Sequence, residues 1–587
     1  MSPAAVRLVL FFLVTGSTAG ASWFLDAALG PQPRGWTEFA MIGCFAALFL
    51  GLAMSFWVSA IGFVRRVSTG SSGQQPMGVL PGQASTVLLV TVRNEDPDRV
   101  FGGLLAMYRD LDQLGVANGF EIFVCSDTDD PKLAGRERGW WNRVVRETGT
   151  QGRIHYRRRE TNTARKSGNV ADFTRRWGGR YRYMILLDAD SRLSAASIVH
   201  MVRRMEGNPR LGLLQAPVYL VDHETLFARL RQFSTRLLAP IQASGMAAWQ
   251  GSEANYWGHN AIIRMVAFAR NCGLPELPGP PPFGGEILSH DFVEAAMMRR
   301  AGWEVRLADD LDGSYEEVPP HLDAFASRER RWCRGNLQHI PLILARGLHP
   351  VSRVHLAMGV MSYLAAPLWL AFLLLGTSSA LNNVSTGVSV TAGFSSPMLL
   401  ALLALVVGFL LLPRLMGFVL AAMPDSGQPF GSRVRLASGL ILECLISALQ
   451  APVMMLYHCS FILEAFGGAL TDWPEQCRAD RCVALREAWC THWVPMAVSA
   501  GCVAVLGLTR PQLLPWLLPA LLGPLLVVPL ASILASVRVG RALRRLGLLV
   551  TPEELSPPAV VCGAGRAEVP EGGGDTVAPG ISCKSAL

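Results

Sequence analysis

Acidic side chains follow three separate apolar runs of the sequence, at the point where each run ends. The runs, each with the residues that follow it, are Val87–Val92 with Asn94 and Glu95, Glu121–Cys125 with Asp127, and Tyr183–Leu187 with Asp188 and Asp190. Asp and Asn are ordinary turn residues, so any one of these positions alone would predict a turn. Three runs that deliver acids in the same way indicate instead one site beyond the carboxyl ends of neighbouring strands.

Asp188 and Asp190 have the most specific chemistry of this group. Two carboxylates one residue apart at a strand end can hold Mg²⁺ or Mn²⁺, because both cations prefer oxygen ligands. A cation held there neutralises the charge that develops on a departing diphosphate. We therefore predict a divalent-metal and diphosphate site at Asp188 and Asp190.

Basic and amide side chains lie between the second and third runs. The two groups are Arg157–Arg159 and Arg165–Asn169, and the second contains Lys166 and Asn169. We expect Lys166 and Asn169 to support the diphosphate. A solvated helix face explains the basic residues equally well when the neighbouring acids are left aside.

Transfer of a group to a hydroxyl also needs a base that removes the hydroxyl proton. Asp291, within Ser289–Glu294, is the candidate for this base. The same spacing fits a capping box in which Asp291 caps a helix and Glu294 lies three residues later. A residue can be both cap and base, so the spacing alone leaves both interpretations open.

Arginine and tryptophan side chains occur together further along the chain, at Arg328, Arg331 and Trp332. Arginine can bind a diphosphate through two parallel hydrogen bonds, and a tryptophan face stacks well on a sugar. The alternative is the positively charged flank of the apolar run that follows.

His259 and Asn260 form a polar cluster suited to an acceptor, although a core role is the ordinary explanation for a histidine.

Short apolar runs that alternate with helical, charged segments would position these residues. Val87–Val92, Glu121–Cys125, Tyr183–Leu187 and Leu211–Gln215 have the length and composition of buried parallel strands. They follow a linker rich in Ser, Gly and Gln at Ser68–Ser85. This pattern predicts an α/β domain with a mostly parallel sheet.

The chain as a whole is too apolar for an ordinary soluble protein. Half of its 587 residues are hydrophobic and only 17% are charged, whereas soluble domains carry about 25% charged residues. The net charge of +8 is spread without a long Lys/Arg tract. This distribution indicates phosphate binding and orientation in a lipid bilayer, with no nucleic acid as a partner.

Apolar runs long enough to cross a bilayer flank the α/β region. They are Val6–Ala28, Phe39–Val64, His355–Leu375, Met398–Ala422 and Leu513–Val537, with Trp493–Thr509 as a shorter candidate and Leu436–Ala465 as a run interrupted by Pro452. Arginines cluster after the second run, before the third and after the last, and all three clusters are expected in the cytoplasm. An even number of crossings must then lie between Arg353 and Arg538. Six crossings result if Leu436–Ala465 is interfacial or re-entrant.

These patterns divide the chain into four parts. We expect two transmembrane helices in 1–64, a cytosolic α/β domain in 65–353, transmembrane and interfacial helices in 354–550 with a cytosolic loop at about 466–493, and a disordered cytosolic tail in 551–587. Cys477, Cys482 and Cys490 near His492 match no standard zinc spacing. Reduced thiols are therefore the plainer interpretation of the scattered cysteines.

Taken in order, these motifs resemble the processive family 2 glycosyltransferases, which include cellulose, chitin and hyaluronan synthases. Those enzymes share a GT-A fold, here inserted between transmembrane helices. The resemblance assigns Asp127 to the nucleoside, Asp188 and Asp190 to the Asp-x-Asp metal motif, Asp291 to the catalytic base, and Arg331-Trp332 to the end of a Gln-x-x-Arg-Trp motif. Arg328 stands where the cellulose synthases have Gln.

That departure is one of several features that are similar to the glucans biosynthesis glucosyltransferase H family. The others are Gly258-His259-Asn260, Glu316 and Glu317 before Pro319-Pro320, and Arg331–Asn336. The resemblance covers Thr86 to Trp493. It places Glu95 and Asp127 on the uridine and a loop, Trp473–Arg478, over the nucleotide site.

The same resemblance implies an enzyme in the inner membrane of a Gram-negative bacterium, with its catalytic domain in the cytoplasm. The donor would be UDP-glucose, and the product an exported β-linked, chiefly β-1,2, glucan made with inversion at the anomeric carbon. Periplasmic glucan-modifying proteins would be its partners. Enterobacterial relatives carry a long cytosolic N-terminal extension, whereas the first apolar run begins at Val6 here, so a regulatory role of that extension is not expected.

Other functions fit part of the pattern. A transferase that moves one sugar onto a polyisoprenyl phosphate would share the Asp-x-Asp site but would not need the Arg-Trp motif or several later spans. A cellulose-synthase-like polysaccharide synthase would share both. A scaffold or transporter built on an inactive transferase domain would have lost the carboxylates at Asp188, Asp190 and Asp291, and all three are present.

Overall fold

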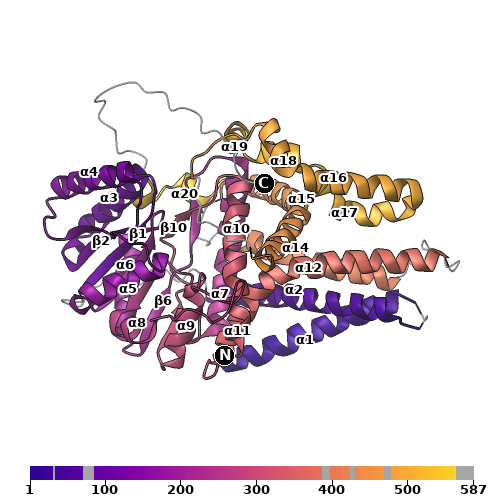
Figure 1. Cartoon of the computed structure of the whole chain (residues 1–587), viewed down its shortest axis with the longest axis horizontal. Helices are drawn as coiled ribbons and strands as arrows, with labels where there is room; N and C mark the ends of the chain where they lie inside the picture. Colours follow the sequence, from indigo (N-terminus) through magenta and orange to yellow (C-terminus); the bar gives the residue numbers. More distant parts are fainter. Residues whose placement is uncertain (31–32, 70–84, 386–396, 424–429, 469–477, 563–587) are drawn as a thin grey trace.

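The computed structural model of the chain describes residues 1–30, 33–69, 85–385, 397–423, 430–468 and 478–562. An α/β domain forms one end of the molecule, and a bundle of long helices projects from its other end (Figure 1). The chain begins in the bundle, enters the α/β domain after its second helix and returns to the bundle afterwards.

A seven-stranded sheet forms the centre of the α/β domain, in the order β3-β2-β1-β4-β8-β6-β9. Its strands are β1 (Thr86–Val92), β2 (Phe120–Ser126), β3 (Ile154–Arg158), β4 (Tyr183–Asp188), β6 (Leu211–Gln215), β8 (Ala261–Arg264) and β9 (Glu304–Leu307). β8 is antiparallel to β4 and β6, and the other neighbours are parallel. The mostly parallel sheet and the four predicted strands are confirmed.

The other three strands escaped the prediction because β3 and β9 mix polar and apolar residues and β8 has only four residues. β3 has the sequence Ile-His-Tyr-Arg-Arg and β9 the sequence Glu-Val-Arg-Leu. By contrast, every residue of β1 is buried, because helices cover both faces of the sheet at its centre. Such a strand appears in the sequence as a continuous apolar run.

Six helices form the two outer layers of the domain. α3 (Pro97–Gln113), α4 (Pro131–Thr148) and α6 (Ala195–Gly207) pack on one face, and α5 (Arg165–Trp177), α8 (Met265–Asn271) and α9 (His290–Arg300) pack on the other. Leu88 and Val90 point to the first face and Val87 and Leu89 to the second, as the period of two in a strand requires. Short 3₁₀ turns lie at Ala117–Gly119 and Gly178–Arg180.

A small second sheet lies beside the carboxyl end of β4. It has the order β5-β10-β7, with β5 (Arg192–Leu193), β7 (Tyr219–Val221) and β10 (Ser314–Glu317). The helices that follow its strands are α7 (Leu226–Gln250), α10 (Leu322–Leu337) and α11 (His339–Ile343). This sheet therefore carries Glu316 and Glu317 to the edge where the predicted site lies.

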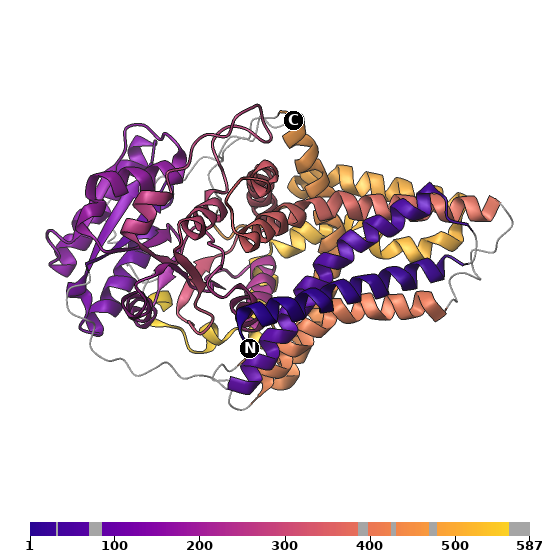
Figure 2. The same ribbon diagram turned by 90° about the horizontal axis from the view of Figure 1, so that it is seen from below.

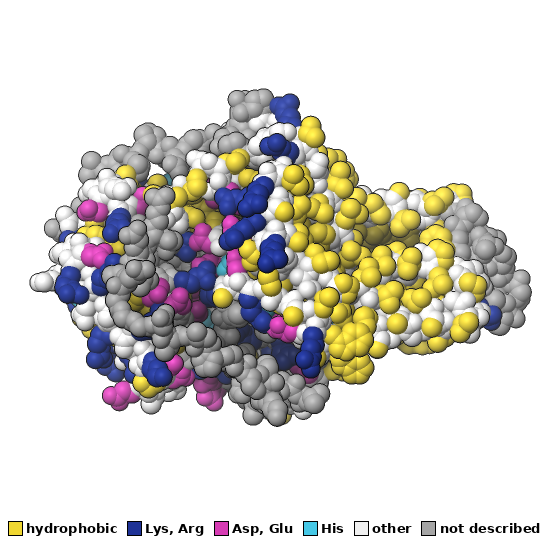
Figure 3. Space-filling model, turned by 90° about the horizontal axis from the view of Figure 1, so that it is seen from above, with side chains coloured by type: hydrophobic (Ala, Val, Ile, Leu, Met, Phe, Trp, Pro, Cys, Tyr) yellow, Lys and Arg dark blue, Asp and Glu magenta, His cyan; other side chains and the backbone are white. Residues whose placement is uncertain are grey.

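Within the described residues, six helices are long and apolar enough to cross a membrane. They are α1 (Pro3–Ala28), α2 (Trp36–Thr69), α12 (Pro350–Ser385), α14 (Pro397–Ala422), α15 (Arg433–Phe466) and α16 (Leu485–Thr509). After a 3₁₀ turn at Pro511–Leu513, α17 (Leu514–Leu525) and α18 (Val527–Leu534) form a seventh candidate bent by 52°. Figure 2 shows these helices extending away from the α/β domain, and in Figure 3 apolar side chains cover the bundle while charged ones gather on the domain.

Helix α7 joins the domain to the bundle by packing along α2. At the crossing, a Cβ added to Gly62 would collide with the Ile241 carbonyl oxygen, and one added to Gly245 would collide with that of Val58. The two backbones therefore touch, which only glycine permits at both positions.

Both ends of α15 contact the α/β side of the molecule. At its start, Leu436 packs with Phe233 of α7. At its end, Glu464 lies 3.3 Å from Arg330, and the Phe466 ring lies 5.8 Å from that of Phe283. Both ends of this 34-residue helix therefore lie against elements that follow the strands of the α/β domain.

The tail beyond residue 550 was predicted to be disordered, and for residues 551–562 this is wrong. After α19 (Val537–Arg545), the chain folds back on the α/β domain as α20 (Pro552–Leu555) and α21 (Ala559–Cys562). Glu554 binds Arg229 at 2.6 Å, Glu553 binds Arg236 at 2.8 Å, and Val560 is buried against α3. Local composition could not reveal partners on a helix over 300 residues earlier. Residues 563–587 lie outside the described part.

Candidate active site

The strand ends that carry the predicted acids meet at one edge of the sheet. β1 lies between β2 and β4 in parallel register, with Val92 opposite Ser126 and Thr91 opposite Asp188. Residues just beyond these strands are therefore neighbours in space. The structure places Glu95, Asp127, Asp188 and Asp190 along this edge.

Asp188 has a cationic partner from α5. The Lys166 ammonium forms an ion pair with Asp188 and also donates to the Gly258 carbonyl oxygen at 2.8 Å. Burial raises the pKa of Asp188, but Lys166 and then His259 outweigh it and lower the pKa to about 2. Asp188 is therefore an ionised carboxylate at neutral pH.

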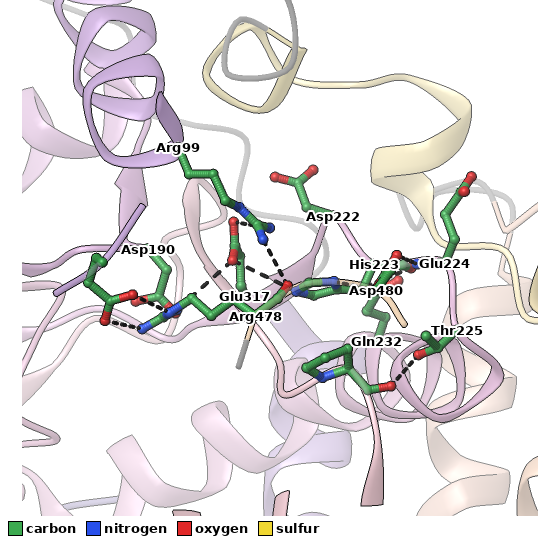
Figure 4. Close-up of polar contacts among 12 residues, drawn as sticks. Arg99, Asp190, Asp222, His223, Glu224, Thr225, Gln232, Glu317, Arg478 and Asp480 are labelled. Atoms are coloured by element: carbon green, nitrogen blue, oxygen red, sulfur yellow. Dashed lines mark hydrogen bonds and ion pairs between the residues drawn. The ribbon is translucent and has the colours of Figure 1, made fainter. Parts of the chain in front are cut away.

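Asp190 and Glu95 share a cation that comes from the segment between α15 and α16. The Arg478 guanidinium donates to both carboxylate oxygens of Glu95, at 2.9 and 3.2 Å, and forms an ion pair with Asp190. Figure 4 shows it pointing at Asp190 and at Glu317, whose Oε2 lies 3.9 Å away. Arg478 ends the loop that was predicted to cover the nucleotide site; Trp473–Cys477 lie outside the described residues.

Glu317 is the centre of a second set of charges. Arg99 lies 2.8 Å from it, Arg192 3.2 Å and His223 3.7 Å. His223 also contacts Asp480 at 2.7 Å, and burial lowers its pKa less than Asp480 and Glu317 raise it, so that its pKa reaches about 9. In the sequence, Glu317 is marked only as a family feature, and no motif contains Arg99, His223 or Asp480.

No local pattern marks these last three residues as parts of one site. Arg99 lies on an amphipathic helix, and His223 follows a three-residue strand. Asp480 is more than 250 residues from His223 in the sequence. Arg99 and His223 are identified only by their contact with Glu317, and Asp480 only by its contact with His223.

Asp291 lies in the first turn of α9, beside Gly258. A Cβ added to Gly258, whose φ is +86°, would lie 3.5 Å from an Asp291 carboxylate oxygen. Burial raises the pKa of Asp291 above its ordinary value; His290 opposes the rise and Glu294 adds to it. The capping-box interpretation is wrong, because Ser289 is the N-cap residue and Glu294 instead contacts His290 at 3.1 Å.

His259 and Asn260 follow Gly258 but point to different places. His259 lies 3.2 Å from Glu316, near the aspartates. Burial raises the pKa of Glu316; His259 opposes the rise, and Asp190 and Asp188 add to it. Asn260 is fully buried and donates to Ser314 at 3.0 Å and to the Tyr315 carbonyl oxygen at 3.3 Å. Its amide therefore holds the two sheets together, which differs from the predicted contact with substrate.

Three more predicted residues are engaged within the protein. Asp127 is bound by the Arg159 guanidinium through two bonds of 2.6 Å. Asn169 is buried and donates to the Cys125 carbonyl oxygen at 3.0 Å, so it fixes α5 to β2 rather than facing the diphosphate site. Asn94 accepts from the Asp129 backbone at 3.1 Å.

The three predicted residues of α10 differ in exposure. Arg331 is buried, and burial, followed by Arg328 and Arg478, lowers its pKa to about 10. Trp332 is 48% exposed, and the Arg328 guanidinium lies 4.5 Å from the centre of its ring. Arg331 thus lies near Arg478 and Glu95, and the Trp332 ring is partly open to the surroundings.

The conceivable zinc group does not assemble from its described members. Cys482 and Cys490 are exposed and free, and His492 lies 2.8 Å from Asp323. Cys477 lies outside the described part. Across the described ranges, no three His, Cys, Asp or Glu side chains converge as metal ligands.

The two aspartates of the Asp-x-Asp motif nevertheless fit a Mg²⁺ or Mn²⁺ ion bound together with a substrate. Their donors are carboxylate oxygens, and each already binds a cationic side chain, Lys166 on Asp188 and Arg478 on Asp190. Mg²⁺ is commonly held by one or two carboxylates, with phosphate oxygens and water completing its shell. Asp188 and Asp190 would supply the protein's part of that shell.

An α/β sheet with an Asp-x-Asp motif at a strand end, set among long apolar helices, defines a membrane-associated glycosyltransferase with a GT-A fold. Residues 183–413 match the family model described as "Glycosyl transferase family group 2". The chain is 39% identical over 586 residues to the glucans biosynthesis glucosyltransferase H of Xanthomonas campestris pv. campestris (strain B100), covering 95% of this chain and 89% of that protein. It belongs to the glucans biosynthesis glucosyltransferase H family.

Two further comparisons differ in extent. The glucans biosynthesis glucosyltransferase H of Ralstonia nicotianae is 40% identical over 571 residues, which cover 94% of this chain and 66% of that protein. Among solved structures, a mannosyltransferase from Pyrobaculum calidifontis in complex with GDP-Man and Mn²⁺ is 14% identical, covers 74% of this chain and 100% of its own, and has a TM-score of 0.43.

Proposed function

We propose that this protein is an inner-membrane, processive glucosyltransferase that uses UDP-glucose to elongate and export the β-linked, chiefly β-1,2, backbone of osmoregulated periplasmic glucans. One observation carries the proposal: Asp188 and Asp291 lie on either side of Gly258, whose carbonyl oxygen accepts from the Lys166 ammonium that pairs with Asp188, while Arg478 joins Asp190 to Glu95. The family relationship supports glucose and a glucan as the sugar and the product.

In this proposal, the donor lies along the carboxyl edge of β1, β2 and β4. Glu95 and Asp127 hold the uridine, and Asp188 and Asp190 hold the divalent cation. The cation, when bound, supplies positive charge against the diphosphate that leaves. Lys166 keeps Asp188 ionised, and Arg331 adds a fixed positive charge at the diphosphate.

Asp291 acts as the base of the reaction. It takes the proton from the acceptor hydroxyl while that oxygen forms a bond to the anomeric carbon of glucose and the bond from that carbon to the diphosphate oxygen breaks. One displacement with one base inverts the anomeric carbon, by the stereochemical argument used for glycosidases. The raised pKa of Asp291 makes it a stronger base than an exposed aspartate. Trp332 and His259 hold the glucan end in this proposal.

The membrane topology follows from the arginine clusters. With the arginines after α2, before α12 and in α19 in the cytoplasm, α1, α2, α12, α14, α16 and the bent pair α17–α18 make six crossings, and α15 lies at the interface. The catalytic domain and residues 478–484 then share the cytoplasmic side. The ion pairs of Arg478 with Glu95 and Asp190 support this arrangement, because they need both segments on one side.

The test is synthesis by membranes that contain the protein, given radiolabelled UDP-glucose and Mg²⁺. The proposal expects release of UDP and a water-soluble β-1,2-glucan identified by linkage analysis, and neither from an Asp291→Asn variant. Asp310→Asn, which changes an exposed partner of Arg204, is the matched control and should remain active. A lipid-extractable monoglucoside would contradict the proposal and favour a polyisoprenyl-phosphate transferase, and a β-1,4-linked polymer would favour a cellulose-like synthase.

A further inference from the structure

Arg478 lies where a metal and a donor would also have to bind. Its guanidinium is mostly buried, and it contacts Glu95 and Asp190 while Glu317 lies within 3.9 Å. A guanidinium offers five N–H donors in a planar fork that matches carboxylates. One side chain therefore neutralises Glu95, the carboxylate proposed for the uridine, and Asp190, a carboxylate proposed for the metal, toward which it points in Figure 4.

A divalent cation on Asp190 would use the same oxygen lone pairs. Asp190 Oδ2 is the atom that Arg478 contacts, and the Asp190 side chain is only 12% exposed. Two cations at ion-pair distance from one buried carboxylate repel each other strongly, because the surroundings screen charge poorly. Arg478 and a metal on Asp190 are thus alternatives for this carboxylate.

The backbone of Arg478 is held in place by a second group of contacts. Arg99 donates to the Arg478 carbonyl oxygen at 2.8 Å, and Asp480 binds both the His223 ring at 2.7 Å and the Glu224 backbone N–H at 3.0 Å. The Arg99 contact joins Arg478 to α3, and the Asp480 contacts join the same segment to the loop between β7 and α7. The segment is therefore held independently of the guanidinium, and the guanidinium can leave Asp190 by a change of side-chain conformation.

We propose that Arg478 is a donor-site residue whose guanidinium takes the place of the divalent cation on Asp190 and Glu95 in the donor-free enzyme, so that metal binding must displace it. Binding of the metal–nucleotide then replaces the Arg478 guanidinium with the metal ion, and the negative charges of Asp190 and Glu95 are neutralised before as well as after binding. This inference rests on the metal site of the proposed function. It makes Arg478 a determinant of metal affinity that the sequence motifs do not contain.

The experiment measures Mn²⁺ binding without nucleotide by electron paramagnetic resonance of free Mn²⁺, on the detergent-purified full-length protein. Arg478→Gln removes the competing charge, so we expect its Mn²⁺ Kd to fall about tenfold below that of the wild type, a typical coupling between two ligands. Arg478→Lys keeps a charge without the fork and should lie between the two. Arg481→Gln, three residues later and paired with Glu487 at 2.7 Å, is the matched control and should bind Mn²⁺ as the wild type does.

Two results would overturn the inference. One is a Kd of Arg478→Gln equal to that of the wild type. The other is a higher Kd, which would mean that the arginine organises the carboxylates for the metal. Asp190→Asn separates this failure from that of the metal site itself. If Asp190→Asn does not weaken Mn²⁺ binding in the Arg478→Gln background, the proposed metal site is wrong. If it does, and Arg478→Gln still matches the wild type, only the present inference fails.

A second variant covers the case in which Arg478→Gln does not fold. Asp480→Asn keeps Arg478 but weakens the contacts to His223 and the Glu224 N–H. We expect it to bind Mn²⁺ more tightly than the wild type, by less than Arg478→Gln. Mn²⁺ affinity equal to that of the wild type in a folded Asp480→Asn protein would contradict the positioning role of Asp480.

Discussion

Carboxylates at the proposed donor site are matched by cations from other parts of the chain. Asp188 pairs with Lys166 of α5, Asp190 and Glu95 with Arg478, and Glu317 with Arg99 of α3. Buried acids remain ionised only where such partners offset the loss of hydration. Removal of one of these cations therefore raises the pKa of the carboxylate that it pairs with, in addition to removing any contact that the cation makes with the substrate.

Lys166→Ala is expected to lower kcat/KM for UDP-glucose by about tenfold to a hundredfold, because a charge-assisted hydrogen bond to Asp188 is lost. Without the ammonium, burial raises the Asp188 pKa unopposed by its strongest partner. Steady-state release of UDP measures the change. Lys132→Ala, at an exposed lysine in the first turn of α4, is the control; equal losses in both variants would contradict the assignment.

The pH dependence of the reaction tests Asp291. Since burial raises its pKa, the carboxylate gains a proton at a higher pH than a free aspartate, whose pKa is about 3.9. As the base must be unprotonated, kcat/KM should fall as the pH falls through this raised pKa. A profile of kcat/KM from pH 4 to pH 9 measures it, and a kcat/KM that stays constant down to about pH 5 would contradict the burial argument.

At the scale of elements, close packing fixes the domain to the bundle. α2 and α7 touch backbone to backbone through Gly62 and Gly245, and α15 lies along α10 with its last turn near Arg330. α10 carries Arg331 and Trp332, so the helix beneath the proposed glucan end rests on a bundle helix. The active site and the membrane part are therefore one packed unit.

Gly245→Val tests the crossing of α2 and α7. The added side chain would collide with the Val58 backbone and force the helices apart, at a cost of about 1–3 kcal/mol for overpacking. We expect a lower midpoint of thermal unfolding in detergent. Gly501→Val makes the same change in α16 at a site with open space and should leave the midpoint unchanged; equal shifts in the two variants would show that the crossing is not special.

At the scale of the whole molecule, several segments that are far apart in the sequence lie on the α/β side of the helical bundle. Residues 85–349, the ends of α15, residues 478–480 and the segment Thr551–Cys562 all meet there. One face of the bundle is thus built from segments far apart in the sequence. This arrangement determines the topology more strictly than apolar length does.

Reporter fusions test the location of α15. If α15 is interfacial, a fluorescent protein fused after Gly468 folds in the cytoplasm and fluoresces, and alkaline phosphatase fused there is inactive. If α15 crosses, the two signals exchange, because Gly468 then lies in the periplasm. Fusions after Gly30, between α1 and α2, serve as the periplasmic reference in either case, because that position precedes α15 in the chain.

Local patterns were sufficient for four strands of the central sheet and for the acids at its edge. β1, β2, β4 and β6 are buried on both faces, so their burial is written as apolar runs, and the carboxyl ends of parallel strands must lie together. The side chains of Asn169 and Asn260 were assigned to substrate because an amide near a strand end suits either role. Their burial and backbone partners depend on neighbouring segments that a local motif does not contain.

Apolar periodicity and strand-end acids are properties of short segments, and these determined the fold class, the membrane character and the position of the site. Ion pairs between residues that are far apart in the sequence cannot be predicted from any short segment, because they depend on which charged groups folding brings within a few ångströms. Arg478 on Glu95 and Asp190, His223 with Asp480, and Glu554 on Arg229 are of this kind. Tertiary structure alone decided them, since a buried charge is stable only beside a partner that the whole fold supplies.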